Sequence, residues 1–372
     1  MGITVILLAL GLLIFFAYRG VSVLFLAPML AVLVAWASGA PTLASYTQLF
    51  MTKTAEFIAS YFPLFFLGAI FGKLMQVSGS ASCIGHWCVR WLGEQRAMLA
   101  VILACGVLTY GGVSLFVVAF AVYPICAAVF RRADIPARLI PGTIALGSFT
   151  FTMTALPGTP AIQNAIPMPY FGTTAFAGPG LGLVAAAIML VVGYAWLAHR
   201  YRLARSKGEG FERNPKATRD EVVEEFRDRA QGEGFDLAEI GTRASSGGGI
   251  ARSLLPVVVV IALNFALSRY YFPGADLTYL ASPLWGGLLP KDVIGLWSII
   301  VSLTVACLLI IALNFKTLRN SVATALADGA DAAVIPIFNT ASLVGFGAVI
   351  AAQPAFTALS SSLLDFYVRI FV

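Results

Sequence analysis

Residues 152–164 read TMTALPGTPAIQN, a polar and conformationally broken stretch inside an otherwise apolar segment. Two prolines and a glycine stand within four residues. Proline lacks the amide hydrogen that a helix needs, and it disfavours helical geometry in the residue before it. The flanking runs, 140–154 and 161–176, are apolar. We therefore expect one membrane-crossing helix that is unwound in its middle.

A second interruption lies upstream, where residues 109–114 read TYGGVS. It separates the apolar pieces Ala97–Leu108 and Val113–Phe130, and the first of these is too short to cross a bilayer. Two adjacent glycines let the backbone turn tightly. The pattern predicts a re-entrant hairpin, which enters the membrane and returns on the same side.

Further apolar runs surround these two breaks, and each approaches the roughly 20 residues that span the hydrocarbon core. In lipid every backbone polar group must be satisfied internally, so helices are the spanning form we expect. The sequence predicts an all-α polytopic membrane protein. The runs are Ile3–Tyr18, Val21–Ser38, Phe57–Val77, Leu181–Leu197, Leu254–Leu267, Val293–Leu313 and Ala333–Ala352.

The composition agrees with lipid as the solvent. Of 372 residues, 59% are hydrophobic and only 11% are charged, with a mean hydropathy of +0.88, whereas soluble domains carry about 25% charged residues. Residues 200–252 hold 11 of the 24 Lys+Arg and 10 of the 18 Asp+Glu. The net charge of +6 sits largely in short loops beside apolar runs, which is typical of membrane topology and not of nucleic-acid binding.

The five cysteines resemble small buried hydrophobes and not a disulfide framework. Cys83, His86 and Cys88 match no common zinc spacing, so we expect no metal site.

The basic loops set the expected orientation. Arg131, Arg132 and Arg138 share one loop, and two other basic clusters follow later spans at 199–205 and 316–319. By the positive-inside rule these loops are cytoplasmic. We expect a protein of the inner (plasma) membrane with a cytoplasmic linker at 200–252.

The two ends of the chain resemble each other. The stretch YFPLF at 61–65 corresponds to VIPIF at 334–338, and apolar runs precede both at similar distances. The predicted topology gives the copies opposite orientations, and such inverted repeats are typical of secondary transporters. We expect a first membrane repeat at 1–199, a linker at 200–252 and a second repeat at 253–372.

The second repeat is expected to be incomplete. The first copy continues from Pro63 through a hairpin and a broken helix to Ala177, whereas the second copy reaches Val372 soon after Pro336. We expect about 75–80 further residues in the intact protein. On this expectation the 372-residue form neither transports nor folds stably.

The two breaks are also the expected binding site. Inverted-repeat transporters bind substrate near the midplane, where half-helix N-termini present free N–H groups and a partial positive charge to anions. A hydroxyl or amide side chain beside such a terminus adds hydrogen bonds. The predicted substrate- or ion-binding residues are Gly111, Gly112, Ser114, Thr154, Gly158, Thr159, Pro160, Gln163 and Asn164.

At these breaks the sequence resembles the gluconate permease family of the ion transporter superfamily. The matching stretches are YGGVSLFV at 110–117, followed by Tyr123-Pro124, and TALPGTPAI at 154–162, which precedes PGLG at 179–182. The resemblance implies an elevator-type fold with two re-entrant hairpins and proton-coupled uptake of small hydroxy-acid anions. It is nearest to the hydroxybutyrate-permease-like branch. Gluconate transporters proper carry an acidic residue where this chain has Gly111, which puts a sugar-acid substrate and the proton-carrying group in doubt.

We therefore predict a permease for a small organic anion, working by proton symport and using no cofactor beyond its coupling ion, H⁺ or Na⁺. The alternatives are a Na⁺-coupled carboxylate transporter, a Na⁺/H⁺ antiporter and a non-transporting membrane scaffold. No nucleophile elbow, metalloprotease motif or intact phosphate loop supports an enzyme. The expected partners are the anion and the bilayer, with a homodimer as an open alternative to the monomer. The ionisable residues near the spans, Lys73, Glu56, His86, Asp328 and Asp331, are expected to be interfacial charges.

Overall fold

The computed structural model describes residues 2–93, 96–113, 115–211, 249–358 and 360–361. Within these residues all regular structure is helical, as the sequence predicts. Each of the seven predicted apolar runs forms a helix: α1 (Gly2–Tyr18), α2 (Val23–Ala37), α4 (Met51–Val77), α12 (Pro179–Ser206), α14 (Ile250–Ala266), α16 (Pro290–Leu313) and α18 (Val322–Ala351). Pro63 and Pro336, the matched prolines of the two copies, both lie inside long helices.

Among the described residues, five helical stretches are long and apolar enough to cross a membrane. One is α4 extended backward through α3 (Thr42–Ala44) and the π-helical η1 (Ser45–Phe50), and another is α14 continued through η4 (Leu267–Tyr271) and α15 (Phe272–Gly274). The other three are α12, α16 and α18. Large apolar side chains along α12, such as Leu181, Val191 and Trp196, are exposed. Exposure of this kind on a helix that is apolar all round is expected where lipid covers the surface.

Shorter elements connect these helices. Between α4 and α12 the chain forms α5 (Ser80–Leu92), α6 (Ala97–Tyr110), α7 (Leu115–Arg132), η3 (Ala137–Leu139), α8 (Ile140–Ser148), α9 (Phe151–Thr154), α10 (Ile162–Ala165) and α11 (Pro167–Phe171). Two 3₁₀ turns, η5 (Thr278–Ala281) and η6 (Pro283–Trp285), precede α16, and α17 (Phe315–Leu318) follows it.

The chain divides into two compact units. The described residues of the first unit fall in 2–62 and 333–361, and those of the second fall in 63–211 and 249–332. Each of the long helices α4 and α18 contributes one part to each unit.

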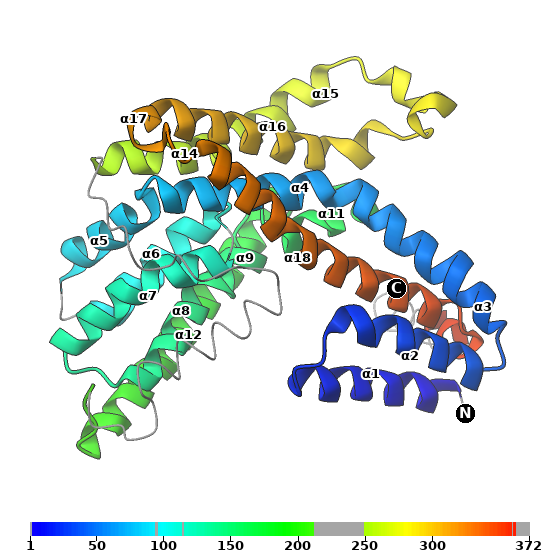
Figure 1. The fold of residues 1–372 in the computed structure, drawn as a ribbon, viewed down its shortest axis with the longest axis horizontal. Coiled ribbons are helices and arrows are strands. Elements are labelled where there is room, and N and C mark those ends of the chain that lie inside the picture. Colours follow the sequence, from blue (N-terminus) through cyan, green and yellow to red (C-terminus); the bar gives the residue numbers. More distant parts are fainter. Residues whose placement is uncertain (1, 94–95, 114, 212–248, 359, 362–372) are drawn as a thin grey trace. The chain divides into compact units, whose positions relative to one another are not determined.

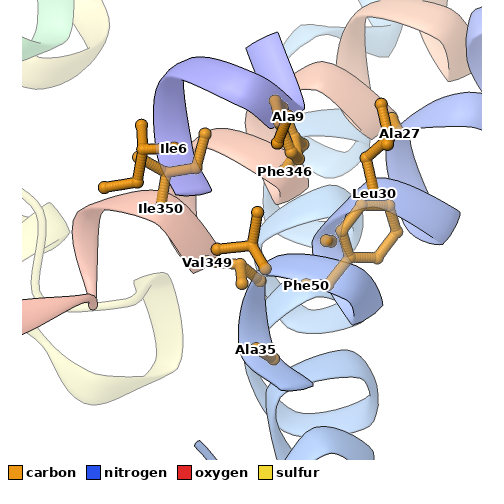
Figure 2. Close-up of a cluster of buried hydrophobic side chains, with 11 residues drawn as sticks. Ile6, Ala9, Ala27, Leu30, Ala35, Phe50, Phe346, Val349 and Ile350 are labelled. Carbon is orange, nitrogen blue, oxygen red and sulfur yellow. The ribbon is translucent and has the colours of Figure 1, made fainter. Parts of the chain in front are cut away.

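The first unit has its own apolar core, shown in Figure 2. Small side chains on α1 and α2, including Ala9, Ala27 and Ala31, let these two helices pack closely. Phe346 and Val349 of α18 fill the remaining space. Close packing in this unit also requires Gly345, because a Cβ at that position would collide with the backbone of Phe50 and the side chain of Thr54.

In the second unit α6 packs against α5, α7 and α8, and α14 packs against α16 (Figure 1). Glycine permits the closest of these approaches. A Cβ at Gly147 on α8 would lie 2.5 Å from the carbonyl oxygen of Ile102 on α6. Helix α12 returns antiparallel along α8, since Gly193 faces Leu146 and Leu197 faces Gly142.

The predicted single unwound helix at 140–176 is divided more finely than expected. Its first half forms α8 and α9, and its second half forms only the short helices α10 and α11. Pro160, Pro167 and Pro169 prevent a long helix here, and Gly172 ends α11 in a left-handed conformation at φ 59°. The backbone N–H of Gly158 donates to the carbonyl of Ala175 at 2.6 Å. The second half therefore turns back to the break instead of continuing as one helix.

Candidate substrate-binding site

The predicted hairpin is present as α6, a glycine turn and α7. Gly112 has φ +90°, which glycine adopts without strain. The N–H of Gly112 donates to Thr109 and that of Val113 donates back to Leu108, at 2.9 and 3.1 Å. These bonds cap the last carbonyls of α6 and reverse the chain. Ser114 lies outside the described residues.

The second predicted break covers residues 155–161, between α9 and α10. Gly158 has φ +89°, and a Cβ there would collide with the ring of Phe176. Asn164 closes the loop, because its side-chain NH₂ donates to the carbonyls of Thr159 and Ala175 at 3.0 and 3.1 Å. The break is thus a defined loop held by side-chain and backbone hydrogen bonds.

The structure brings the two breaks together. The Tyr110 hydroxyl donates to the carbonyl of Pro157 at 2.7 Å, which ties the end of α6 to the second break. At the hairpin tip, a Cβ on Gly112 would lie 2.7 Å from Cγ of Pro160. Sequence analysis predicted each break separately, and their direct contact follows from the fold.

The other predicted site residues lie in different surroundings. Thr159 is completely buried, and its hydroxyl oxygen accepts from the N–H of Ala161 at 3.3 Å. Thr154 is exposed and donates to the carbonyl of Thr150 in its own short helix at 3.0 Å. Gln163 is exposed. The glycines, Thr159, Pro160 and Asn164 therefore gather around the two breaks, whereas the side chains of Thr154 and Gln163 reach the surface.

Two helices from the C-terminal half cover the joined breaks. A Cβ on Gly111 would lie 2.6 Å from Val257 of α14, and one on Gly112 would lie 3.4 Å from Leu303 of α16. Asn264, two turns beyond Val257 on α14, donates from its side chain to the carbonyl of Gly158 at 3.4 Å. The candidate site is thus formed by residues from both halves of the sequence.

Sequence analysis missed Asn264. It is an isolated amide inside the apolar run Leu254–Leu267, and a polar residue within a membrane helix is by default a candidate for function. That signal was available and could have found it. Its side-chain oxygen is buried and has no hydrogen-bond partner among the residues that the structure describes, and the same is true of the hydroxyl oxygen of Thr109 at the end of α6.

One ion pair joins the long helices within the second unit. Lys73 of α4 and Asp328 of α18 lie 2.9 Å apart, with side chains 19% and 38% exposed. The sequence predicted both as interfacial charges, and the structure pairs them with each other. A second pair, Lys53–Glu56, lies along α4 itself and is more exposed, at 47% and 56%.

A metal site finds no support among the described residues, where His, Cys, Asp and Glu form no group of three that could hold an ion. None of the five cysteines, all of which lie in the described part of the chain, forms a disulfide. What the arrangement offers chemically is a set of backbone and side-chain hydrogen-bonding groups in an apolar setting.

No protein-family model matches the sequence. A curated protein of Bacillus subtilis (strain 168), the "Uncharacterized transporter YxjC", is 40% identical over 370 residues. The alignment covers 98% of this chain and 75% of that protein.

Proposed function

The chain belongs to the transporter family of Bacillus subtilis YxjC, and from that premise we propose that it carries a small organic anion, of the hydroxy-acid class, by proton symport. As a multi-pass helical membrane protein with a transporter relative, it has the framework for such a task. The substrate class rests on the resemblance of residues 110–117 and 154–162 to gluconate permeases.

The observation that carries the proposal is the meeting of the two helix breaks. Transporters bind ligands where helices are interrupted, because irregular backbone at membrane depth is tolerated only around a cavity or inside protein. Here Tyr110 and Gly112 of one break contact Pro157 and Pro160 of the other. The 18-residue helix α7 begins just beyond this contact, so its N-terminal dipole favours an anion there.

Coverage of the breaks by α14 and α16 supports the inverted-repeat arrangement. Binding sites of such transporters lie at the repeat interface, where one repeat moves against the other. An elevator-type movement would change the contacts of Gly111 with Val257 and of Gly112 with Leu303, which the structure holds closed. The proposed topology places residues 200–252 in the cytoplasm, on the basis of the clustered basic residues around them.

We propose that the ion pair between Lys73 and Asp328 couples transport to the movement of the proton. Loss of this ion pair would release Lys73 from Asp328, so the two long helices would no longer be held together at this point. Ionisable residues in membrane helices are costly and mark proton or ion pathways. The more exposed Lys53–Glu56 pair bridges no second helix and serves as the control.

The test is uptake of labelled 3-hydroxybutyrate, glycerate and gluconate by the purified full-length protein in proteoliposomes. We expect accumulation of at least one of the anions when the interior is alkaline, and none without a gradient. Uptake that needs Na⁺ and ignores the pH gradient would favour the Na⁺-coupled alternative. Failure to transport any of the three under either gradient would refute the proposed function.

A further inference from the structure

Asn264 is one of two polar residues on the buried face of α14, the other being Ser253. Val257, Val260 and Asn264 are all buried and follow each other at helical spacing, so they share one face. The Val257 end of this face contacts Gly111 of the hairpin tip, and the Asn264 end contacts the second break. Asn264 is only 1% exposed.

The contact with Gly158 fixes the orientation of the amide. A backbone carbonyl oxygen can only accept, so the NH₂ group of Asn264 must face it. The side-chain oxygen then points elsewhere, and within the described part of the chain it has no hydrogen-bond partner. On the other side of Gly158 lies Phe176, whose ring meets that of Phe265, the residue after Asn264, edge-on at 5.1 Å.

An acceptor in such a place is costly unless something donates to it, since buried polar groups without a partner destabilise the fold. A carboxylate cannot satisfy it, because an ionised carboxylate only accepts hydrogen bonds. A cation would need several oxygen ligands, and the side chain of Asn264 supplies one. A hydroxyl group of the ligand meets the requirement with a single hydrogen bond.

We propose that Asn264 is a specificity-determining residue, whose side-chain oxygen accepts a hydrogen bond from a hydroxyl group of the transported anion. This inference rests on the proposed function and deepens it. The carboxylate of the anion is held at the breaks of the N-terminal half, and its hydroxyl is recognised from the C-terminal half. The carrier therefore distinguishes a hydroxylated anion from a deoxy anion of the same length.

The test compares 3-hydroxybutyrate with butyrate, which differ by one hydroxyl group. In proteoliposomes the wild-type protein should favour 3-hydroxybutyrate about tenfold or more in initial uptake rate at limiting concentration, because a site built around a hydroxyl group rejects the analogue without it. Asn264→Leu should bring this ratio close to one, by slowing 3-hydroxybutyrate uptake while butyrate uptake persists.

Asn314→Leu is the matched control. Asn314 is another buried amide at the end of a membrane helix, 3% exposed, but it donates to Ile310 in its own helix at 3.1 Å. Its replacement should leave the ratio unchanged. A loss of preference in Asn314→Leu equal to that in Asn264→Leu would overturn the inference.

Asn264→Ser provides a second variant with a side chain small enough for the same space, and it too should lose preference. An unchanged ratio in either folded variant refutes the role of Asn264, and so does a wild-type ratio near one. A Na⁺ requirement that disappears in Asn264→Leu, with the ratio unchanged, would refute it as well and would indicate a cation ligand. In all these outcomes anion uptake persists, so they refute the role of Asn264 and not the proposed function. If the wild-type protein takes up none of the anions, the proposed function itself is refuted.

Discussion

Replacement of Gly112 by alanine should damage the protein specifically through the contact between the two breaks. Two costs add at this position. An L-residue at φ +90° costs about 1–2 kcal/mol. The new Cβ would also lie 2.7 Å from Cγ of Pro160, and overpacking of this kind costs about 1–3 kcal/mol. The total is about 2–5 kcal/mol, which corresponds to a fall of several degrees in apparent unfolding temperature.

Gly20→Ala separates the two costs. Gly20 has a similar φ of +84°, but nothing lies within 4 Å of the position of its Cβ. It should therefore show only the backbone cost. The difference between the two variants measures the contact with Pro160, and Pro160→Ala in the Gly112→Ala background should recover part of it, since residues in contact are not additive.

The assays are the apparent unfolding temperature of the purified protein in detergent and the initial rate of anion uptake in proteoliposomes. We expect Gly112→Ala to lower uptake about tenfold or more, because a displacement of about 1 Å at a binding centre has effects of that size. Gly20→Ala should retain uptake. If the two variants behave alike in both assays, and Pro160→Ala brings no recovery, the contact between the breaks does not hold the site.

Three further predictions follow from single contacts. Tyr110→Phe removes the 2.7 Å hydrogen bond to the second break, worth about 1 kcal/mol, and should lower the initial uptake rate several-fold with no change in the amount of folded protein. Asp328→Asn should abolish accumulation driven by a pH gradient while exchange of anion across the membrane persists, because the residue that pairs with Lys73 can no longer be charged. Gly329→Ala should lower the apparent unfolding temperature, because its Cβ would lie 2.8 Å from the backbone of Ile70 and overpacking costs about 1–3 kcal/mol.

Each of these has a control in the same chain. Tyr270→Phe changes an exposed tyrosine on η4 and should leave uptake unchanged. Glu56→Gln breaks the exposed pair with Lys53 and should leave pH-driven accumulation intact. Gly347→Ala lies on α18 like Gly329, with nothing near the position of its Cβ, and should be neutral or slightly stabilising because alanine favours a helix. Equal effects in a variant and its control would contradict the corresponding prediction.

The helices were predictable from sequence because lipid leaves few alternatives. A long apolar run must satisfy its backbone internally, so the run Val293–Leu313 matches α16 (Pro290–Leu313) closely. The run Leu181–Leu197 gives the start of α12, but the helix continues past the apolar run to Ser206. The glycine turn at 111–112 and the break around Gly158 were predictable for the same kind of local reason. Each depends on what the backbone of a few neighbouring residues can adopt.

The return of the chain after the break was not predictable in this way. Apolar residues at 161–176 are compatible with a crossing helix, but contacts such as the bonds of Gly158 and Asn164 to the carbonyl of Ala175 hold the segment folded back. The pairing of Lys73 with Asp328 is of the same kind, since it joins residues from opposite ends of the sequence. A single sequence does not show which distant residues are in contact, whereas local backbone conformation can be predicted from neighbouring residues.

Asn264 shows how the two kinds of information combine. Its polarity inside an apolar run marks it as unusual, but the same mark fits Asn314, whose amide bonds within its own helix. What distinguishes Asn264, and leads to the proposed role, is its position against Gly158, with one side-chain atom bonded and the other without a partner among the described residues. The free oxygen comes from the C-terminal half and the breaks come from the N-terminal half. If transport moves one half against the other, as we propose, that movement would separate the two sides of the site, and substrate binding and the conformational change would then act on the same contacts.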